Sequence, residues 1–426
     1  AFKAESFDYP EVFFEKTVHQ IPRPRPDKSS IAEAADILRQ AEKPLIVSGG
    51  GVFYSGAVSE LTDFAEHHNI PIVETIAGRG MMLHDHPNNA GPLGVIGSSS
   101  ANALAEEADV ILAVGTRLQD FITGSWSVFG NEKMRLISLN AARYDAHKHR
   151  ALSVVGDALV GIEELGKSLA DWSGSESWTS KAGTLYAEWN RTIEEHSRKT
   201  DTVPPSYAHV VGAVNRVCDD TDLALTASGG FPGELCKNWK TKTVGTFDCE
   251  FGFSCMGYEI AGGWGAKMAD PSRDVIVFVG DGAYLMLNSD VYSSVLTGHK
   301  MIIILCDNGG FGVINRLQNY KGSASFNNLL EDSKVEHLEY VDFVQHAKSM
   351  GALGEQVESI FELEAAFKRA KLADRTYLIS IKVQQHQWTP GDAWWDVGVP
   401  EVSQRKEVRQ ARTDHSEGQK KQRIGV

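Results

Sequence analysis

Two glycine-rich turns carry the groups in this sequence that are best suited to bind a metal ion. The first, Gly280-Asp281-Gly282, directly follows the apolar run Val275–Val279. The second, which contains Asn308 and Gly310, directly follows the apolar run Met301–Leu305. A carboxylate, a side-chain carbonyl and a backbone carbonyl are hard oxygen donors of the kind that Mg2+ takes. Glycines also let backbone N–H groups approach a phosphate closely. The turns therefore predict a site for Mg2+ and phosphate, to which Asp281 and Asn308 contribute.

The two apolar runs are the elements that must position these turns. They are short and rich in β-branched residues, which is typical of strands buried on both faces of a parallel sheet. Between them, Leu287, Val291 and Val295 recur at helical spacing and Gly298 supplies a stop, so we predict a helix that starts near Ala283. Because the carboxyl ends of parallel strands form the ligand crevice of an open sheet, the two turns should be neighbours. For either turn alone, an ordinary strand–helix–strand unit is the alternative interpretation.

Three further segments flank the predicted site. Ser228–Pro232 follows the predicted strand Leu223–Thr226, so it belongs to the same edge of the sheet, with a tight structural turn as the alternative. Met256 precedes the predicted helix Tyr258–Ala269, and by residue type alone it is a core residue. The polar stretch Val313–Lys334 is long for a connection, which favours a lid over the site.

The bulk composition limits the class of protein. With 426 residues, of which 42% are hydrophobic, the chain can bury two cores. A net charge of −14 argues against a nucleic acid or an anionic membrane as partner. The sequence has no run of 18 apolar residues, and its start, AFKAESFDYP, does not resemble a signal peptide, so we expect a cytoplasmic protein. Five cysteines without a CxxC pair predict reduced thiols.

The alternation of short apolar runs and helical segments predicts an α/β fold with two doubly wound, mostly parallel-sheet domains. In the first domain the predicted strands are Pro44–Ser48, Ile70–Glu74, Val110–Val114, Arg135–Leu139 and Ser153–Val155. We expect a proline-rich linker from a preceding domain over residues 1–29, a Rossmann-like middle domain over 30–170, a helical linker over 171–203, and the ligand-binding domain with a C-terminal arm over 204–426.

Other residues of chemical interest have ordinary interpretations. Gly49-Gly50-Gly51 follows the first predicted strand, but the spacing is not GxGxxG, which argues against a bound dinucleotide. His84 and His86 are of a type that binds metals, but they lack supporting ligands, so we interpret them as part of a solvated turn. His386 follows the predicted strand Tyr377–Val383, and an active-site role is the less favoured interpretation.

The motifs around the two turns resemble those of thiamine diphosphate-dependent enzymes. Within that superfamily the similarity is greatest to the hydrolases that open a cyclic 1,2-dione in myo-inositol breakdown. It extends from about Tyr9 to the tail segment Trp394–Arg405. Several independent segments carry it: Ser228–Leu235, Glu250–Ala269, Gly280–Asp290 and Asp307–Gln318.

The resemblance implies a thiamine diphosphate cofactor anchored through Mg2+, with Asp281, Asn308 and the backbone oxygen of Gly310 as the metal ligands. By position in the family pattern, Met256 is the apolar wedge that bends the cofactor, and Met286 is a second apolar candidate near the ring. The implied cofactor-binding residues are Gly229, Gly230, Phe231, Ser254, Met256, Gly280, Asp281, Gly282, Ala283, Met286, Asn308 and Gly310. The activating glutamate of the resembled enzymes lies in an N-terminal pyrimidine-binding domain, which we expect to be missing from this sequence, so we assign no catalytic residue.

The function implied by the resemblance is hydrolytic C–C cleavage of a small cyclic polyol-dione to an open-chain acid, 5-deoxy-glucuronate. The resemblance also implies a homodimer or homotetramer. Two alternatives stay open at this stage. The enzyme could be a carboligase similar to acetolactate synthase, or the chain could be a non-catalytic cofactor-binding protein or one subunit of a split enzyme.

Overall fold

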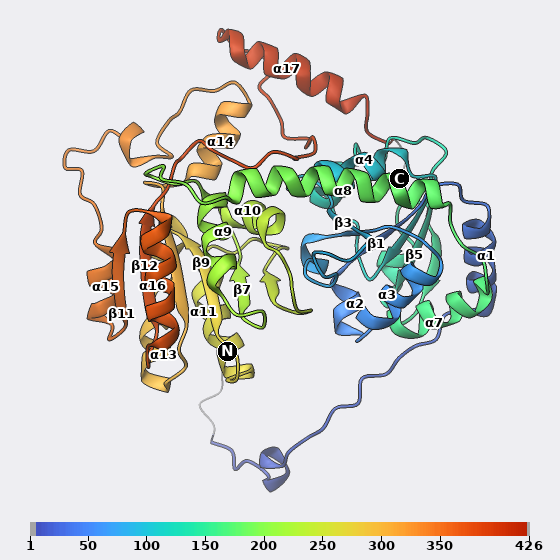
Figure 1. Ribbon diagram of the computed structural model, residues 1–426, viewed down its shortest axis with the longest axis horizontal. Helices are drawn as coiled ribbons and strands as arrows, with labels where there is room; N and C mark the ends of the chain where they lie inside the picture. The colour runs from blue at the N-terminus through green and yellow to red at the C-terminus, as the bar shows by residue number, and fades with distance from the viewer. Residues whose placement is uncertain (1–5, 424–426) are drawn as a thin grey trace.

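Two parallel sheets, each of six strands, form the framework of the chain, which a computed structural model describes over residues 6–423. Helices cover both faces of each sheet, and the sheets lie side by side (Figure 1). The predicted α/β fold with two doubly wound domains is confirmed. The first sheet has the order β3-β2-β1-β4-β5-β6, with β1 (Pro44–Ser48), β2 (Ile72–Glu74), β3 (Asn89–Pro92), β4 (Val110–Val114), β5 (Arg135–Asn140) and β6 (Leu152–Val155).

The second sheet contains the strands that precede the predicted site. Its order is β11-β12-β10-β9-β7-β8, so successive strands are added on opposite sides of β7. The crevice between β7 and β9 is therefore the switch point at which open α/β sheets bind ligands. The strands are β7 (Leu223–Thr226), β8 (Phe247–Cys249), β9 (Val275–Gly280), β10 (Ile302–Asp307), β11 (Leu353–Val357) and β12 (Tyr377–Lys382).

The helices pack on the sheets through their apolar faces. Those of the first domain are α1 (Lys28–Arg39), α2 (Gly50–Tyr54), α3 (Val58–His67), α4 (Ser99–Glu107), α5 (Asp120–Thr123), α6 (Arg143–Ala146) and α7 (Ala158–Leu169). Those of the second are α9 (Tyr207–Val217), α10 (Phe231–Asn238), α11 (Tyr258–Ala269), α12 (Asp281–Met286), α13 (Asp290–Thr297), α14 (Gly312–Tyr320), α15 (Phe343–Ser349) and α16 (Ile360–Leu372). Short 3-10 turns occupy Glu11–Phe14, Ile76–Gly78 and Leu330–Asp332.

One local prediction was wrong. The single helix expected between β9 and β10 is two helices, because the backbone at Leu287 adopts an extended conformation and its side chain is exposed. Elsewhere, α1 begins at Lys28 because the Asp27 carboxylate accepts a hydrogen bond from the Ser29 N–H and so caps the helix. A carboxylate at this position satisfies a free donor of the first turn and complements the helix dipole.

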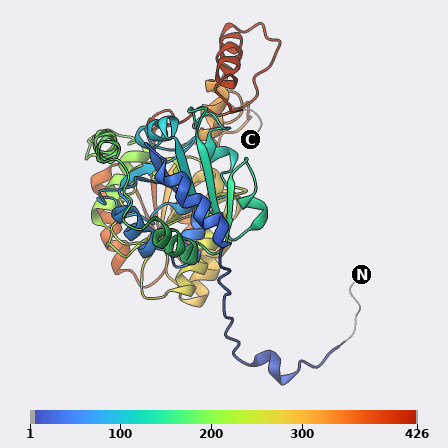
Figure 2. The same ribbon diagram turned by 90° about the vertical axis from the view of Figure 1, so that its right-hand side faces the viewer.

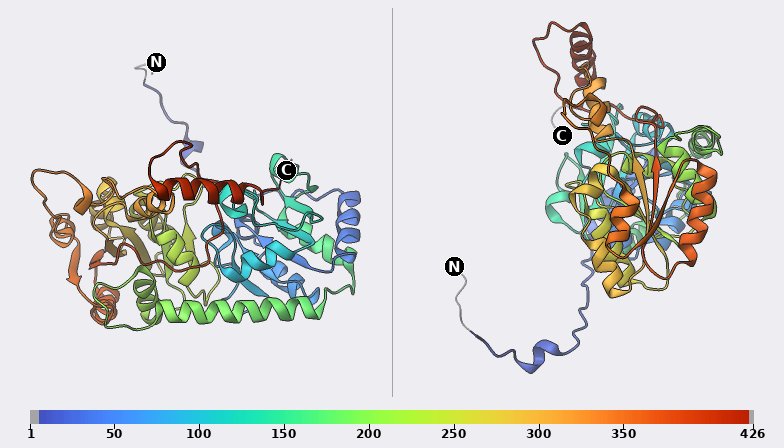
Figure 3. Two further views of the ribbon diagram at one scale, coloured as in Figure 1. Left: turned by 90° about the horizontal axis from the view of Figure 1, so that it is seen from above. Right: turned by 90° about the vertical axis from the view of Figure 1, so that its left-hand side faces the viewer.

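Helix α8 (Glu176–Ser197) runs along both domains (Figure 3, left). It contacts α4 and β3 of the first domain and α9 and α10 of the second. At its start, the Trp178 indole donates a hydrogen bond to the Pro44 carbonyl at the beginning of β1, 2.8 Å away. Tyr186 and Trp189, further along the helix, are buried. Because this one helix contacts both domains along its length, it helps to fix the position of one sheet relative to the other.

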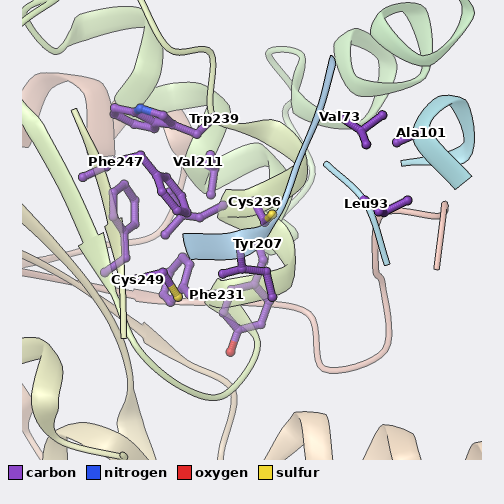
Figure 4. Close-up of a cluster of buried hydrophobic side chains, with 14 of the residues drawn as sticks. Val73, Leu93, Ala101, Tyr207, Val211, Phe231, Cys236, Trp239, Phe247 and Cys249 are labelled. Atoms are coloured by element: carbon purple, nitrogen blue, oxygen red, sulfur yellow. The ribbon is translucent and has the colours of Figure 1, made fainter. Parts of the chain in front are cut away.

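The hydrophobic core continues across the domain boundary. Val73, Leu93 and Ala101 of the first domain belong to the same buried cluster as Tyr207 and Trp239 of the second (Figure 4). Burial of this shared apolar surface holds the two domains together.

A buried ion pair also joins the domains. Glu74, at the end of β2, accepts a hydrogen bond from Arg79 at 2.8 Å, and both side chains are almost fully buried. The same guanidinium donates to the carbonyls of Cys236 and Trp239, at 2.8 and 2.7 Å, at the end of α10. Arg79 therefore satisfies two carbonyls that the end of a helix would leave unpaired.

The segment that follows β12, residues 383–423, forms a C-terminal arm that returns from the second domain to the first. The indole of Trp395 donates to the Asp120 carboxylate at 2.8 Å, and the backbone N–H of Arg423 donates to the Trp126 carbonyl. Between these contacts, α17 (Lys406–Gln419) projects beyond the two domains, as does the exposed segment that precedes α1 (Figure 2). Among the described helices, none combines the length and apolarity needed to cross a bilayer.

We expect Arg79→Ala to lower the free energy of unfolding by about 3–5 kcal/mol, because it leaves the Glu74 carboxylate buried without its cation. Urea denaturation of the purified chain measures this loss. Arg191→Ala is the matched control, since Arg191 is exposed on α8 and its ion pair with Glu188 is worth at most about 1 kcal/mol. Equal stabilities of the two variants would contradict the role assigned to Arg79.

Candidate functional site

The two glycine-rich turns meet at the carboxyl edge of the second sheet. Cys306 of β10 is paired with Gly280 of β9, so the residues that follow each strand are neighbours. Asp281 begins α12 directly after β9, and one of its carboxylate oxygens, Oδ2, accepts a hydrogen bond from the Gly310 N–H at 2.7 Å. The structure therefore brings Asp281, Asn308 and Gly310 together, as the sequence predicted.

Two buried oxygens at this edge lack a hydrogen-bond partner among the described residues: Oδ1 of Asp281 and Oδ1 of Asn308. The two side chains are only 5% and 7% exposed. Burial, with a further contribution from the nearby Asp307 carboxylate, raises the pKa of Asp281 to about 7. Buried polar atoms without partners are rare, and a bound cation satisfies both oxygens at once.

The donor set fits a hard divalent cation such as Mg2+. Carboxylate, amide oxygen and backbone carbonyl are its preferred protein ligands, and phosphate oxygens and water complete its coordination. Among the described residues no group of three or more His, Cys, Asp and Glu side chains is placed to hold a metal ion. His86 instead contacts the Glu66 carboxylate at 2.9 Å, and His84 lies 3.2 Å from the Tyr186 hydroxyl.

Two hydrogen bonds hold Asn308 in place without using its free oxygen, Oδ1. Its amide nitrogen donates to the Tyr207 hydroxyl at 2.6 Å, and its backbone carbonyl accepts from the Gln385 amide at 2.8 Å. The sequence analysis missed Tyr207, because an aromatic residue in an apolar helix is usually a core residue. Of the two residues that hold Asn308, Gln385 was easier to find in the sequence, because it is polar and follows the predicted strand at β12.

The glycines around the crevice divide into two kinds. Gly229 and Gly280 have open space where a side chain would begin, and they lie at the tips of β7 and β9 on either side of the switch point. Gly310 has a φ of +140°, and a Cβ there would lie 2.5 Å from the Asn328 carbonyl oxygen. Gly229 and Gly280 therefore leave room for a ligand such as a diphosphate. Gly310 instead shapes the loop that carries Asn308.

Glu259 is a second residue that the sequence analysis missed. It is fully buried, one carboxylate oxygen accepts from the Ser228 N–H at 3.0 Å, and the other accepts from the Gly257 N–H at 2.9 Å. Burial raises the pKa of this carboxyl above its ordinary value. The side chain thus ties the turn after β7 to the turn before α11. A carboxylate in the first turn of a helix whose only other charged residue is Lys267, near its end, was the available signal.

The remaining predicted site residues lie around this crevice at different depths. Phe231 is buried beneath the turn after β7, with its ring edge-on to Tyr207 at 4.9 Å. Ala283 is buried in α12, whereas Met286 at the end of that helix is exposed. Met256 is half-buried and packs on the apolar cluster of β9 and β10. The cofactor roles of these residues stay predictions.

A cavity of about 630 Å3 adjoins the crevice, because Ser228 and Gly229 line both. It lies between the domains, and most of its lining is apolar. The first domain contributes Val95, Ile96 and Phe121, α14 contributes Val313, Ile314 and Leu317, and the C-terminal arm contributes Trp394 and Trp395. The position of α14 places part of the stretch predicted as a lid at this cavity, but closure itself stays a prediction.

The glycine turns of the first domain have a structural use. A Cβ on Gly51 would lie 2.7 Å from the Gly115 Cα, so the two turns pack backbone against backbone. This close approach explains glycine at both positions without a nucleotide. His386 is exposed and lines a groove to which Asp307, Asn308 and Gly309 also contribute, and its active-site role stays a prediction.

Comparison with known proteins identifies the class. Residues 31–165 match the family described as thiamine pyrophosphate enzyme, central domain, and residues 228–381 match thiamine pyrophosphate enzyme, C-terminal TPP binding domain. The chain therefore belongs to the thiamine pyrophosphate enzymes, which confirms the resemblance in its motifs.

Several similar curated proteins carry the name 3D-(3,5/4)-trihydroxycyclohexane-1,2-dione hydrolase. The protein of Geobacillus thermodenitrificans is 37% identical over 448 residues, which cover 98% of this chain and 70% of that protein. The proteins of Bacillus thuringiensis and Clostridium tetani are each 36% identical and cover 96% of this chain and 68% of their own length.

We expect Glu259→Gln to lower the free energy of unfolding by about 1–3 kcal/mol. The amide offers one acceptor where the carboxylate offers two, so one buried N–H of Ser228 or Gly257 faces a donor. Chemical denaturation measures the effect, and Glu188→Gln on the exposed face of α8 serves as control. If both variants unfold at the same denaturant concentration, Glu259 does not tie the two turns together.

Proposed function

We propose that this chain supplies the thiamine diphosphate and Mg2+ site of a hydrolase that opens 3D-(3,5/4)-trihydroxycyclohexane-1,2-dione to 5-deoxy-glucuronate. The observation that carries the proposal is the pair of buried, unpartnered oxygens on Asp281 and Asn308 at the switch point of the second sheet. The names of the similar proteins support the choice of substrate.

In this proposal each part of the site has a separate task. Asp281, Asn308 and the Gly310 carbonyl hold Mg2+, and the open glycines Gly229 and Gly280 leave room for the diphosphate. When bound, thiamine diphosphate supplies a nucleophilic carbon and an electron sink for C–C cleavage. The remaining assigned contacts are Gly230, Phe231, Ser254, Met256, Gly282, Ala283 and Met286.

The cavity between the domains suits a small organic substrate. Its volume is in the range of small-molecule sites, and Ser228 and Gly229 connect it to the crevice. Lys321 adds a positive charge to the lining, and it has no ion-pair partner in the described part of the chain. Ring opening converts a neutral dione into an acid, so a cation here would favour the product carboxylate.

We also propose that the glutamate that would activate the cofactor lies outside residues 6–423. Each buried glutamate of residues 6–423 already has structural partners: Glu74 pairs with Arg79, Glu234 accepts from the Thr389 hydroxyl, and Glu259 accepts from two backbone N–H groups. We also propose a homodimer or homotetramer, since the exposed apolar side chains of Phe253, Leu285 and Met286 beside the crevice need a cover.

Calorimetric titration with thiamine diphosphate tests the site. We expect binding in the presence of Mg2+, loss of binding on removal of the cation, and loss of at least tenfold in affinity for Asp281→Ala, because the substitution removes the carboxylate ligand. Asp374→Ala, at an exposed carboxylate, is the matched control. Binding that needs neither Mg2+ nor Asp281 would contradict the proposal. An assay of the reaction then follows the acid that the dione releases, measured as the protons that a weak buffer takes up.

A further inference from the structure

We propose that Tyr207 and Trp388 are positioning residues that orient the Asn308 amide so that its oxygen, and not its nitrogen, faces a divalent cation. The inference rests on the proposed function, because it concerns the same cation site. It assigns a role to two aromatic residues that lie far from Asn308 in the sequence, one at the start of α9 and the other in the C-terminal arm.

The first observation is the contact between the amide and the phenol. A side-chain amide presents nitrogen and oxygen in nearly the same shape, so an unrestrained Asn308 could turn its NH2 group toward a cation and repel it. The Tyr207 hydroxyl accepts from this nitrogen at 2.6 Å, which leaves Oδ1 as the free atom.

The second observation is the packing of the Tyr207 ring. Trp388 stacks on it with ring centres 5.4 Å apart and planes at 15°, and Phe231 meets it edge-on. Gly230 makes the stack possible, because a Cβ at this position would lie 2.9 Å from the indole. The phenol is therefore confined on both sides and cannot swing away from the amide.

The third observation is how the indole itself is held. The guanidinium carbon of Arg316 lies 5.0 Å from the centre of the Trp388 ring, and the same guanidinium donates to Asp392 at 2.6 Å. Asp392 also pairs with the buried Lys237 at α10. The contacts thus run from Asp392 of the arm and Arg316 of α14, through Trp388 and Tyr207, to the Asn308 amide. The arm must be in place for this chain of contacts to form.

A structural role alone does not account for the arrangement. Other buried polar atoms in the described part of the chain also lack a partner, among them Oδ1 of Asn238, so a free atom alone does not point to a ligand. The free oxygens of Asn308 and Asp281 differ in their placement, because both follow neighbouring strands at the carboxyl edge of the sheet. The amide is fixed in the one orientation that adds an oxygen to this pair.

The test measures Mn2+ binding, in the presence of thiamine diphosphate, by the loss of the free-ion electron paramagnetic resonance signal. We expect Tyr207→Phe to weaken Mn2+ binding by about 10- to 100-fold, the usual effect of removing a residue that orients a metal ligand. Trp388→Phe should lose less affinity than Trp388→Ala, since it keeps a stacked ring. Tyr186→Phe is the matched control, because this buried phenol contacts His84 instead of the site.

A second background separates positioning from stability. In Asn308→Asp, both terminal atoms of the side chain are oxygens, so either rotation of the carboxylate presents an oxygen to the cation. We expect Tyr207→Phe to change the Mn2+ affinity of this background by less than about threefold. An equal loss in both backgrounds, or no loss in either, would overturn the inference. Absence of Mn2+ binding by the unmodified protein would instead overturn the proposed function, and the inference with it.

Discussion

A carboxylate that is held away from water needs a proton, a cation or enough hydrogen-bond donors, and Asp281 has only part of what it needs. One oxygen accepts from the Gly310 backbone, while the other has no partner among the described residues, and the carboxylate of Asp307 lies nearby. The parallel sheet creates this situation, because β9 and β10 deliver their polar turns to the same edge. A cation at this edge would meet this need, as proposed above.

The support for the site comes from segments that are distant in the chain. The start of α9 supplies the phenol beside Asn308, α11 supplies the carboxylate that ties two turns together, and the C-terminal arm supplies the indole that confines the phenol. Each contact fixes a group that would otherwise rotate. Preorganisation of this kind lowers the cost of ordering the site when a ligand binds.

The first domain contributes to the site by holding the second in place. Arg79 crosses the boundary to the carbonyls at the end of α10, and the residue at the start of that helix, Phe231, packs against Tyr207. The apolar cluster shared by the two sheets and the long helix α8 make the joint stiff. The cavity between the domains therefore has walls from both, and its shape depends on the joint.

The amino-acid sequence by itself determined the elements whose signal is local. Continuous apolar runs predicted the buried strands, and the polar turns after them placed Asp281 and Asn308 at one edge, because parallel strands end on the same side. Only the tertiary structure decided which side chains complete the site. Tyr207, Glu259 and Arg79 act through partners 30 or more positions away, and no local pattern distinguishes a tyrosine that packs in a core from one whose hydroxyl also orients an amide. The same holds for the break between α12 and α13, where the backbone is extended at Leu287 although the apolar residues recur at helical spacing.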